Sequence, residues 1–302
     1  MGAAPQKTVV ITGATSGFGK GLALKLGAAG HRLVLAARRR GLLEEVAAAS
    51  GEAIAVPTDV SSEQQMRALA TAAVDRFGSF DAWINNAGVG ALGRFDAVPV
   101  RDHRRVVEVN LVGTMLGCHL AVQHFRERQS GTLVNVASFA GRISVPYYNS
   151  YGATKAAIEA LGRSLRAELR LDGLDEVHVC TVSPLAADTP FFIHAGNYTG
   201  HELRPLPPIY DPETIIDVIA GLLEHPKDEV VVGNLGKLAA GANALLPGVT
   251  EKTMAQLAQK QQYELAPAAP DTSGSLHEPL AEGSGVRGGV KEQIARQDAQ
   301  RH

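Results

Sequence analysis

Three tyrosines within five positions, followed by a lysine, mark the stretch PYYNSYGATKAA at residues 146–157. A phenol has an ordinary pKa of about 10, so it exchanges protons poorly near neutral pH unless a nearby cation lowers that pKa. Tyr151 and Lys155 are four residues apart in a segment with helical character, so their side chains share one helix face. The spacing predicts that Tyr151 is an acid/base whose pKa Lys155 lowers. The alternative is aromatic packing beside a surface lysine.

A glycine-rich loop offers a second kind of chemistry near the N-terminus. The sequence TGATSGFG at residues 12–19 follows an apolar run and opens a helix-like segment. Glycines at such a turn let the backbone approach a pyrophosphate, whose charge then faces the N–H groups of the helix. The loop predicts a dinucleotide site, and an ordinary tight turn is the alternative.

The elements that would position these groups alternate regularly along the chain. Apolar runs rich in Val, Ile and Leu, typical of strands covered on both faces, are separated by Ala- and Leu-rich helical segments that end in Gly. The predicted strands are residues 8–12, 32–37, 53–59, 80–88, 131–138, 176–184 and 229–233. The pattern predicts an α/β fold, a Rossmann-type doubly wound parallel sheet of about seven strands flanked by helices, with ligands at the carboxyl ends of the strands.

The residues after the second predicted strand bear on the cofactor. An acidic residue there accepts hydrogen bonds from the adenosine ribose, whereas an arginine can pair with a 2′-phosphate. This chain places Arg38, Arg39 and Arg40 there. We therefore expect NADP(H) rather than NAD(H), with Arg38 as the first candidate for the phosphate contact and Arg39 as the second. A solvated basic turn is the alternative.

The glycine spacing resembles the T-G-x-x-x-G-x-G loop of the classical short-chain dehydrogenases/reductases, and the resemblance continues through the first 190 residues. Asp59 and Val60 match the adenine-contacting pair of the family, and NNAG at residues 85–88 matches its fourth-strand motif. The catalytic tetrad that the resemblance implies consists of Asn110, Ser138, Tyr151 and Lys155.

The resemblance also implies a role for each of these residues. Ser138 would hydrogen-bond the substrate oxygen, and Asn110 would organise a water that links to Lys155, which holds the nicotinamide ribose. Tyr151 would move the proton while hydride passes reversibly between nicotinamide and a carbonyl or secondary alcohol. The chain is thus expected to be a short-chain oxidoreductase of the CH–OH group.

The cofactor contacts expected from the loop, the arginines and the resemblance form one set, and no metal site is expected. They are Gly13, Thr15, Ser16, Gly17, Phe18, Gly19, Arg38, Arg39, Asp59, Val60, Asn86, Ala87, Gly88, Tyr151, Lys155, Pro184 and Thr189. One departure lies after the sixth predicted strand, where Leu185 replaces the usual glycine of the family and puts the backbone path near the nicotinamide in doubt.

Residues 186–211 are rich in proline and aromatic side chains and read as a long excursion, a substrate lid over the sheet edge. Its apolar side chains suit a small hydrophobic carbonyl or alcohol, although they could equally pack the lid onto the sheet. His194 is expected to be a polar lid residue, and Tyr147 is a further candidate pocket wall. The predicted substrate residues are Ser138, Tyr148, Tyr151, Phe191 and Phe192.

Three segments follow from these patterns. Residues 1–234 are expected to form the Rossmann-fold catalytic domain, including the lid. Residues 235–265 read as a helical extension, with two short helices broken at Pro247-Gly248. Residues 266–302 are rich in Pro, Gly, Ser and Ala and predict a poorly ordered or partner-docked tail.

Composition limits the partners and the compartment. The net charge of −2 provides no excess of positive charge for binding nucleic acid. The sequence contains no run of about 18 apolar residues, so no membrane span is predicted. Cys118 and Cys180 lie in apolar surroundings, so we expect buried free thiols and a cytoplasmic protein. The resemblance implies a homodimer or homotetramer built on the helices that carry Asn110 and Tyr151.

Two other functions remain as alternatives. A dinucleotide-binding sensor or scaffold would have lost catalysis, but the tetrad is complete. An epimerase or dehydratase of the extended subfamily has a different glycine spacing and usually a larger substrate domain.

Overall fold

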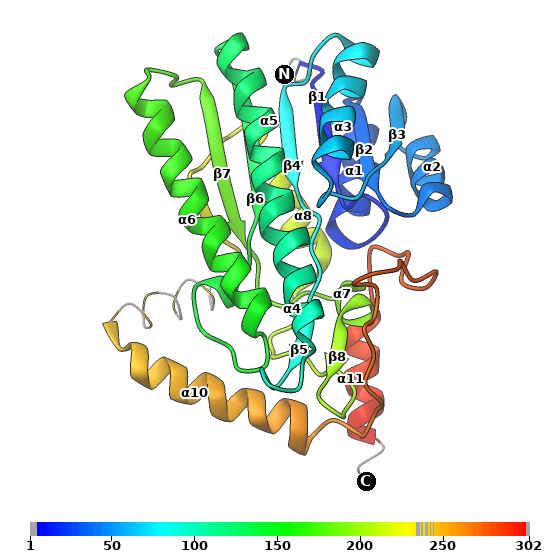
Figure 1. Cartoon of the computed structure of the whole chain (residues 1–302), viewed down its shortest axis with the longest axis vertical. Helices are drawn as coiled ribbons and strands as arrows, with labels where there is room; N and C mark the ends of the chain where they lie inside the picture. Colours follow the sequence, from blue (N-terminus) through cyan, green and yellow to red (C-terminus); the bar gives the residue numbers. More distant parts are fainter. Residues whose placement is uncertain are drawn as a thin grey trace.

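A parallel sheet of seven strands forms the centre of the structure, a computed structural model that describes residues 5–233, 236, 238, 241, 243 and 245–299. The strand order is β3-β2-β1-β4-β6-β7-β9, so the chain reverses its direction of travel across the sheet between β1 and β4 (Figure 1). The strands are β1 (Thr8–Thr12), β2 (Arg32–Ala37), β3 (Ala53–Pro57), β4 (Ala82–Asn85), β6 (Gly131–Val136), β7 (Val177–Ser183) and β9 (Glu229–Val231). The predicted doubly wound α/β fold is confirmed.

Helices cover both faces of the sheet because its strands are apolar on both sides. Val9 and Ile11 of β1 enter one hydrophobic core with α1, α2 and α8, while Val10 between them enters the other with α3, α5 and α6. The helices of the two layers are α1 (Gly17–Ala28), α2 (Arg40–Ala48), α3 (Glu63–Phe77), α5 (Gly113–Arg128), α6 (Asn149–Leu171) and α8 (Pro212–Gly221). Cys118 and Cys180 are buried free thiols, one in each core, as predicted.

The helix that carries Asn110 is not uniform. It starts as α4 (Val100–Val107), widens to a π-helical turn over Glu108–Val112, and continues as α5. π-helical turns inside α-helices are frequent at functional sites. The run Val100–Arg128 is long and apolar enough for a membrane span, but half of its most apolar window is buried inside the protein, as in the core helices of globular folds.

Beyond the carboxyl ends of the strands, the lid and the segment after β4 form a second, two-stranded sheet. β8 (Gly196–Tyr198) pairs in parallel with β5 (Ala91–Gly93), and a single-turn helix, α7 (Phe191–His194), precedes it. These three-residue strands were not predicted, because each is too short to show an alternating pattern.

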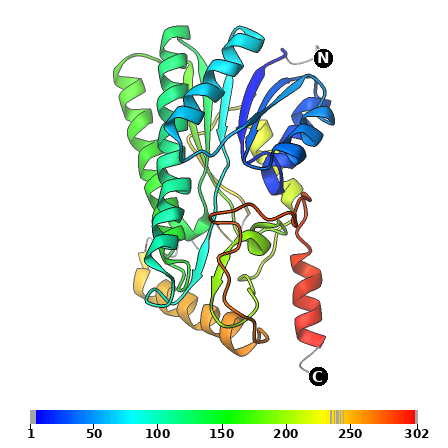
Figure 2. The ribbon, with the colours of Figure 1, turned by 45° about the vertical axis from the view of Figure 1, so that its right-hand side comes forward.

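The C-terminal part of the chain packs below and beside the lid (Figure 1). α10 (Pro247–Gln259) begins at the predicted proline and ends in a π-helical turn, Lys260–Glu264, while most of the other predicted helix lies outside the described residues. Residues 266–289 run from the lid to α11 (Val290–Ala299) (Figure 2). The side chains of Leu276, Val290 and Gln297 in this C-terminal part are buried. A poorly ordered or partner-docked tail is predicted there, but apolar anchors and backbone pairing hold these residues to their own chain.

Candidate active site

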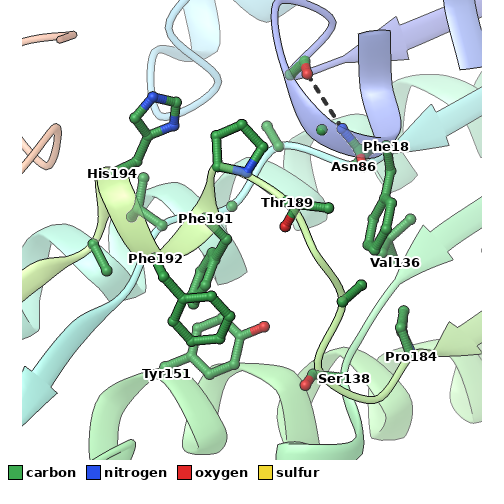
Figure 3. Close-up of a pocket in the computed structure, with 18 of the residues that line it drawn as sticks. Phe18, Asn86, Val136, Ser138, Tyr151, Pro184, Thr189, Phe191, Phe192 and His194 are labelled. Atoms are coloured by element: carbon green, nitrogen blue, oxygen red, sulfur yellow. Dashed lines mark hydrogen bonds between the residues drawn. The ribbon is translucent and has the colours of Figure 1, made fainter. Parts of the chain in front are cut away.

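A cavity of about 520 Å³ lies at the carboxyl ends of the parallel strands, under the lid (Figure 3). It takes in the glycine loop, the ends of β2, β4 and β6, the start of α6 and the lid. Gly19 and Asn110 do not line it, but every other predicted site residue does. Those residues are Gly13, Thr15, Ser16, Gly17, Phe18, Arg38, Arg39, Asp59, Val60, Asn86, Ala87, Gly88, Ser138, Tyr148, Tyr151, Lys155, Pro184, Thr189, Phe191 and Phe192.

The glycine loop is shaped by contacts that only glycine permits. A Cβ at Gly13 would lie 2.9 Å from the Ala87 Cα, and one at Gly19 would overlap the carbonyl oxygen of Gly13. The amide of Asn86 donates to the carbonyl oxygens of Thr12 at 2.9 Å and Gly13 at 3.3 Å, which ties the loop to the end of β4. Gly19 therefore shapes the loop from behind rather than lining the cavity.

The start of α1 is suited to an anion. Ser16 is the N-cap residue of the helix, and its side chain makes no capping hydrogen bond to the first-turn N–H groups. Such groups carry partial positive charge and bind phosphate. The Gly17 N–H donates to the Gly285 carbonyl at 2.9 Å, and the rest of this helix start, together with the close glycine packing, fits the pyrophosphate of a dinucleotide.

Ser138 and Tyr151 come from different elements and meet at the inner end of the cavity (Figure 3). Ser138 follows β6, and its hydroxyl accepts a hydrogen bond from the Ala140 N–H at 3.2 Å, which caps a single 3₁₀ turn. Tyr151 lies in the first turn of α6. Burial raises the pKa of the Tyr151 phenol, and the neighbouring Ser138 hydroxyl, as a hydrogen-bond partner, lowers it by less.

Lys155 is buried one helical turn after Tyr151. Its ammonium donates to the Val136 carbonyl oxygen at 2.7 Å and lies 5.6 Å from the centre of the Tyr151 ring. Burial lowers the pKa of Lys155 to about 8. The helical spacing was correct, but the predicted lowering of the Tyr151 pKa is not seen, because desolvation of the buried phenol dominates.

Asn110 stands behind the site in the π-helical turn. Its Oδ1 accepts from the Val89 N–H at 2.8 Å, and its Nδ2 donates to the Val89 carbonyl at 2.9 Å and to Thr154 Oγ1 at 3.1 Å. Asn110 thus fixes the loop after β4 against the helix that carries Lys155.

The basic residues gather at the outer end of the cavity. Arg38 and Arg39 line it, and burial lowers the pKa of both guanidinium groups. The carboxylate of Asp59 accepts from Arg105, whose Nη2 lies 2.5 Å from Oδ2. Sequence reasoning missed Arg105, since one arginine in a basic helix gives no signal of its tertiary partner.

The other end of the cavity is apolar. Phe191 and Phe192 point into it above Tyr151 (Figure 3). Tyr148, the N-cap residue of α6, also lines it. Tyr147 does not line it and instead donates to Gln259 Oε1 at 2.6 Å. Sequence reasoning missed the remaining wall, which comes from the lid prolines and the C-terminal segments. These further lining residues include Leu206, Pro207, Pro208, Met254 and Leu257 at the apolar end, and Ser275, Pro279 and Leu280 at the basic end, where Arg38 and Arg39 bind the backbone of Ser275 and Leu280.

Leu185, which follows the sixth predicted strand, and His194 of the lid have clear positions. Leu185 lines the cavity, and its side chain fills the space beside Gly236, where a Cβ would overlap it. The His194 ring is within hydrogen-bonding distance of the Glu282 carbonyl oxygen, 3.0 Å from Nε2, and burial lowers its pKa. His194 is thus a polar lid residue that contacts the C-terminal segment.

The doubly wound sheet, the glycine loop and the buried Tyr151–Lys155 pair together define a dinucleotide-binding oxidoreductase. The family model for the short chain dehydrogenases matches residues 7–197. The chain therefore belongs to the short-chain dehydrogenase family.

Known relatives agree with this family. A 3beta-hydroxysteroid dehydrogenase 1 from Eggerthella lenta is 33% identical over 255 residues, which are 80% of this chain and 95% of that protein. A 3-ketoacyl-(acyl-carrier-protein) reductase from Brucella melitensis, complexed with NADH, has a TM-score of 0.66 and 29% identity, covering 75% of this chain and 96% of the other. An alcohol dehydrogenase from Thermococcus sibiricus, complexed with 5-hydroxy-NADP, has a TM-score of 0.64 and 27% identity at the same coverage. A nicotinamide dinucleotide is thus the cofactor class.

Proposed function

We propose that the protein is an NADP(H)-dependent oxidoreductase that interconverts an apolar carbonyl compound and its secondary alcohol. One observation carries the proposal: Ser138, Tyr151 and Lys155 converge where the glycine-loop end of the cavity meets its apolar end. A bound nicotinamide supplies or accepts the hydride at that boundary. An oxygen held between Ser138 and Tyr151 would then receive or lose the proton.

The pKa shifts suit the site to catalyse carbonyl reduction near neutral pH. Burial keeps the Tyr151 phenol protonated, so it can act as a general acid toward a carbonyl oxygen. Lys155, with a pKa of about 8, remains largely charged at pH 7 and stabilises the negative charge that develops on the phenol as it gives up its proton.

Preference for NADP(H) rests on the residues after β2. The strand ends at Ala37, and the next residues are Arg38, Arg39 and Arg40, so the position after the strand offers no carboxylate to the ribose hydroxyls. Asp59, a carboxylate close enough to act on the charge of Arg38, is paired with Arg105. The related structures contain both NADH and an NADP analogue, so the argument rests on the residues of this chain.

The apolar end of the cavity supports a hydrophobic substrate. Phe191, Phe192 and Tyr148 surround Tyr151, and Met254 and Leu257 of α10 complete the wall. The Eggerthella relative is named for a hydroxysteroid, a bulky apolar secondary alcohol, which is consistent with such a cavity.

The decisive experiment is oxidation of NADPH, followed at 25 °C and pH 7, against ketones, aldehydes and quinones of increasing size, with NADP+ reduction by the matching alcohols. We expect turnover that grows with the apolar area of the substrate and is abolished in Tyr151→Phe. No turnover with any compound would support a sensor or scaffold instead.

We also propose a cytoplasmic homodimer or homotetramer. Val112 and Met115 are exposed on the helix that continues from Asn110, and Leu171 is exposed at the end of α6. Apolar side chains on the two helices expected to associate support such an interface. Light scattering coupled to size exclusion, with Met115→Glu compared with wild type, tests it.

A further inference from the structure

Residues 272–290, here called the strap, lie against the outer, basic end of the cavity. The strap runs from the small sheet of the lid to the start of α11, across the edge of the glycine-loop half (Figure 2). Ser275, Pro279 and Leu280 of the strap line the same cavity as Arg38 and Arg39. The strap thus forms part of the wall where the adenosine of a dinucleotide would lie.

Arginine side chains from the loop after β2 hold the strap through its backbone. Arg38 donates to the carbonyl oxygens of Ser275, Leu276 and His277 at 2.5, 3.2 and 3.1 Å. Arg39 donates from Nη1 to the carbonyls of Leu280 and Glu282, each at 3.1 Å. Hydrogen bonds from charged donors are stronger than neutral ones, so these contacts seat the strap firmly.

The start of α1 adds two more contacts. The Gly17 N–H donates to the Gly285 carbonyl at 2.9 Å, and the Lys20 ammonium donates to the Ser284 carbonyl at 2.9 Å. A further contact joins the strap to α4, where the His277 ring lies 2.7 Å from the buried carboxylate of Asp102.

The lid holds both ends of the strap. At the first end, Thr272 exchanges backbone hydrogen bonds with Asn197, and the Ser275 N–H donates to the His194 carbonyl at 2.8 Å. At the second end, the Asp188 carboxylate accepts from the Val290 N–H at 2.7 Å. The strap therefore cannot swing away from the sheet without straining the lid.

The strap does not use all the donors of Arg38. Carbonyl oxygens of the strap accept two hydrogen bonds from Nη1 of Arg38 and one from Nη2. In the described part of the chain, neither Nε nor the second hydrogen of Nη2 has an acceptor. These two donors form the fork that binds phosphate in a bidentate manner. By contrast, Arg39 uses Nε and Nη2 on Thr15 and Nη1 on the strap. Arg38 is thus the better placed of the two for a phosphate.

Glycines set the contact between the strap and the lid. A Cβ at Gly288 would overlap the Thr189 carbonyl, and one at Gly283 would lie 2.6 Å from the His194 Nε2. Gly274 and Gly289, near the two ends, have positive φ angles of 53° and 70°. Outward movement of the residues between these glycines would break the arginine contacts, the Gly17–Gly285 backbone bond and the packing of Leu276, but no helix or strand of the described chain, since none lies between them.

We propose that the strap is an additional wall of the cofactor site, which the dinucleotide must open to enter or leave and which opens together with the lid. The proposal needs only that a nicotinamide dinucleotide binds, so it stands apart from the substrate and from the direction of reaction. A closed strap would enclose the adenosine end and slow the release of the cofactor.

The first test measures the release of reduced cofactor by stopped-flow. NADPH, or NADH in a parallel run, is bound to the full-length protein and displaced by excess oxidised cofactor while nicotinamide fluorescence is followed. Gly288→Ala, which presses the strap against Thr189, and His277→Ala, which removes the contact with Asp102, should each speed release about tenfold or more. Gly221→Ala is the matched control, because nothing lies within 4 Å of the Cβ that it adds.

The second test is amide hydrogen exchange of the wild-type protein with and without the cofactor. We expect peptides that cover the strap and residues 188–204 of the lid to gain protection together when the cofactor binds. Equal release rates in all variants, or faster exchange of the strap in the presence of cofactor, would overturn the proposal. Protection of the strap with no change in the lid would overturn the joint opening.

Discussion

The ammonium group of Lys155 lies 5.6 Å from the centre of the Tyr151 ring and donates to the Val136 carbonyl oxygen at 2.7 Å. Both side chains are desolvated, and burial moves their pKa values apart, upward from 10.0 for the phenol and downward from 10.5 to about 8 for the amine. A neutral acid beside a cation that readily loses its proton is suited to proton transfer.

Two tyrosines face the same cavity, and only one is expected to act as an acid. Tyr151→Phe should lower turnover by roughly 100-fold or more, since it removes the proton donor beside Ser138. Tyr148→Phe should keep turnover within a few-fold, because the Ser138 hydroxyl and the Lys155 ammonium lie beside Tyr151, whereas the pKa of Tyr148 responds to burial and to Tyr151. Steady-state rates of both variants, with cofactor binding checked by fluorescence, test this. Equal losses in the two variants would contradict the assignment.

Lys155→Met should lower turnover and raise the free energy of unfolding. Desolvation disfavours the charged amine, so its replacement by an apolar side chain of similar length is expected to raise the free energy of unfolding at pH 7 by about 1–3 kcal/mol. Turnover should fall at least 100-fold. Urea unfolding followed by circular dichroism tests the first point, and a less stable variant would contradict it.

The stability gain of Lys155→Met should depend on pH in a defined window. Below pH 8 the amine is charged in the folded and unfolded wild-type protein, so the full cost of burying the charge is present. Between pH 8 and the ordinary pKa of 10.5, the folded state has lost its proton and the unfolded state keeps it, so the wild type gains stability as pH rises. The difference between variant and wild type should therefore shrink across this window. A constant difference would contradict the lowered pKa.

The rate of carbonyl reduction should fall at alkaline pH. Tyr151 stays protonated well above neutral pH, whereas Lys155 loses its charge near pH 8. We expect kcat/KM for reduction to be flat from about pH 6 to 7.5 and to fall above about pH 8. A profile that rises through this range would indicate that a different group limits the reaction.

Arg38→Asp should reverse the choice of cofactor. An acidic residue there repels a 2′-phosphate and can accept hydrogen bonds from the ribose hydroxyls instead. We expect the KM for NADPH to rise about tenfold or more relative to the KM for NADH. The ratio matters because Arg38 also holds the strap, so both values can shift. Arg40→Asp is the exposed control, and an unchanged ratio in Arg38→Asp would contradict the proposed preference.

Gly19→Ala should abolish cofactor binding although Gly19 does not line the cavity. The added Cβ would overlap the Gly13 carbonyl and lie 2.6 Å from Asn86 Nδ2, which displaces the loop. Gly41→Ala, where nothing lies within 4 Å, is the control and should bind normally. Fluorescence titration with NADPH measures both variants. Normal binding by Gly19→Ala would show that the loop can adapt.

The sequence by itself predicted the sheet, because strands covered on both faces must be apolar throughout, and seven such runs mark their own positions. It also indicated the glycine loop and the Tyr151–Lys155 pair, since backbone turns and helical spacing are local properties. The direction of the Tyr151 pKa could not be predicted in this way, because desolvation depends on what the whole fold places around the phenol.

Only the tertiary structure decided which distant segments complete the site. Arg105 pairs with Asp59 from another element, and Asn110 braces Val89 from a π-helical turn, neither of which spacing along the chain reveals. The C-terminal segment shows the limit most clearly. Its composition resembles that of a disordered tail, yet arginines that follow β2 and polar groups of the lid bind its backbone carbonyls and N–H groups. Backbone carbonyl and N–H groups do not depend on the side chain, so no residue pattern predicts which distant side chains they will bind.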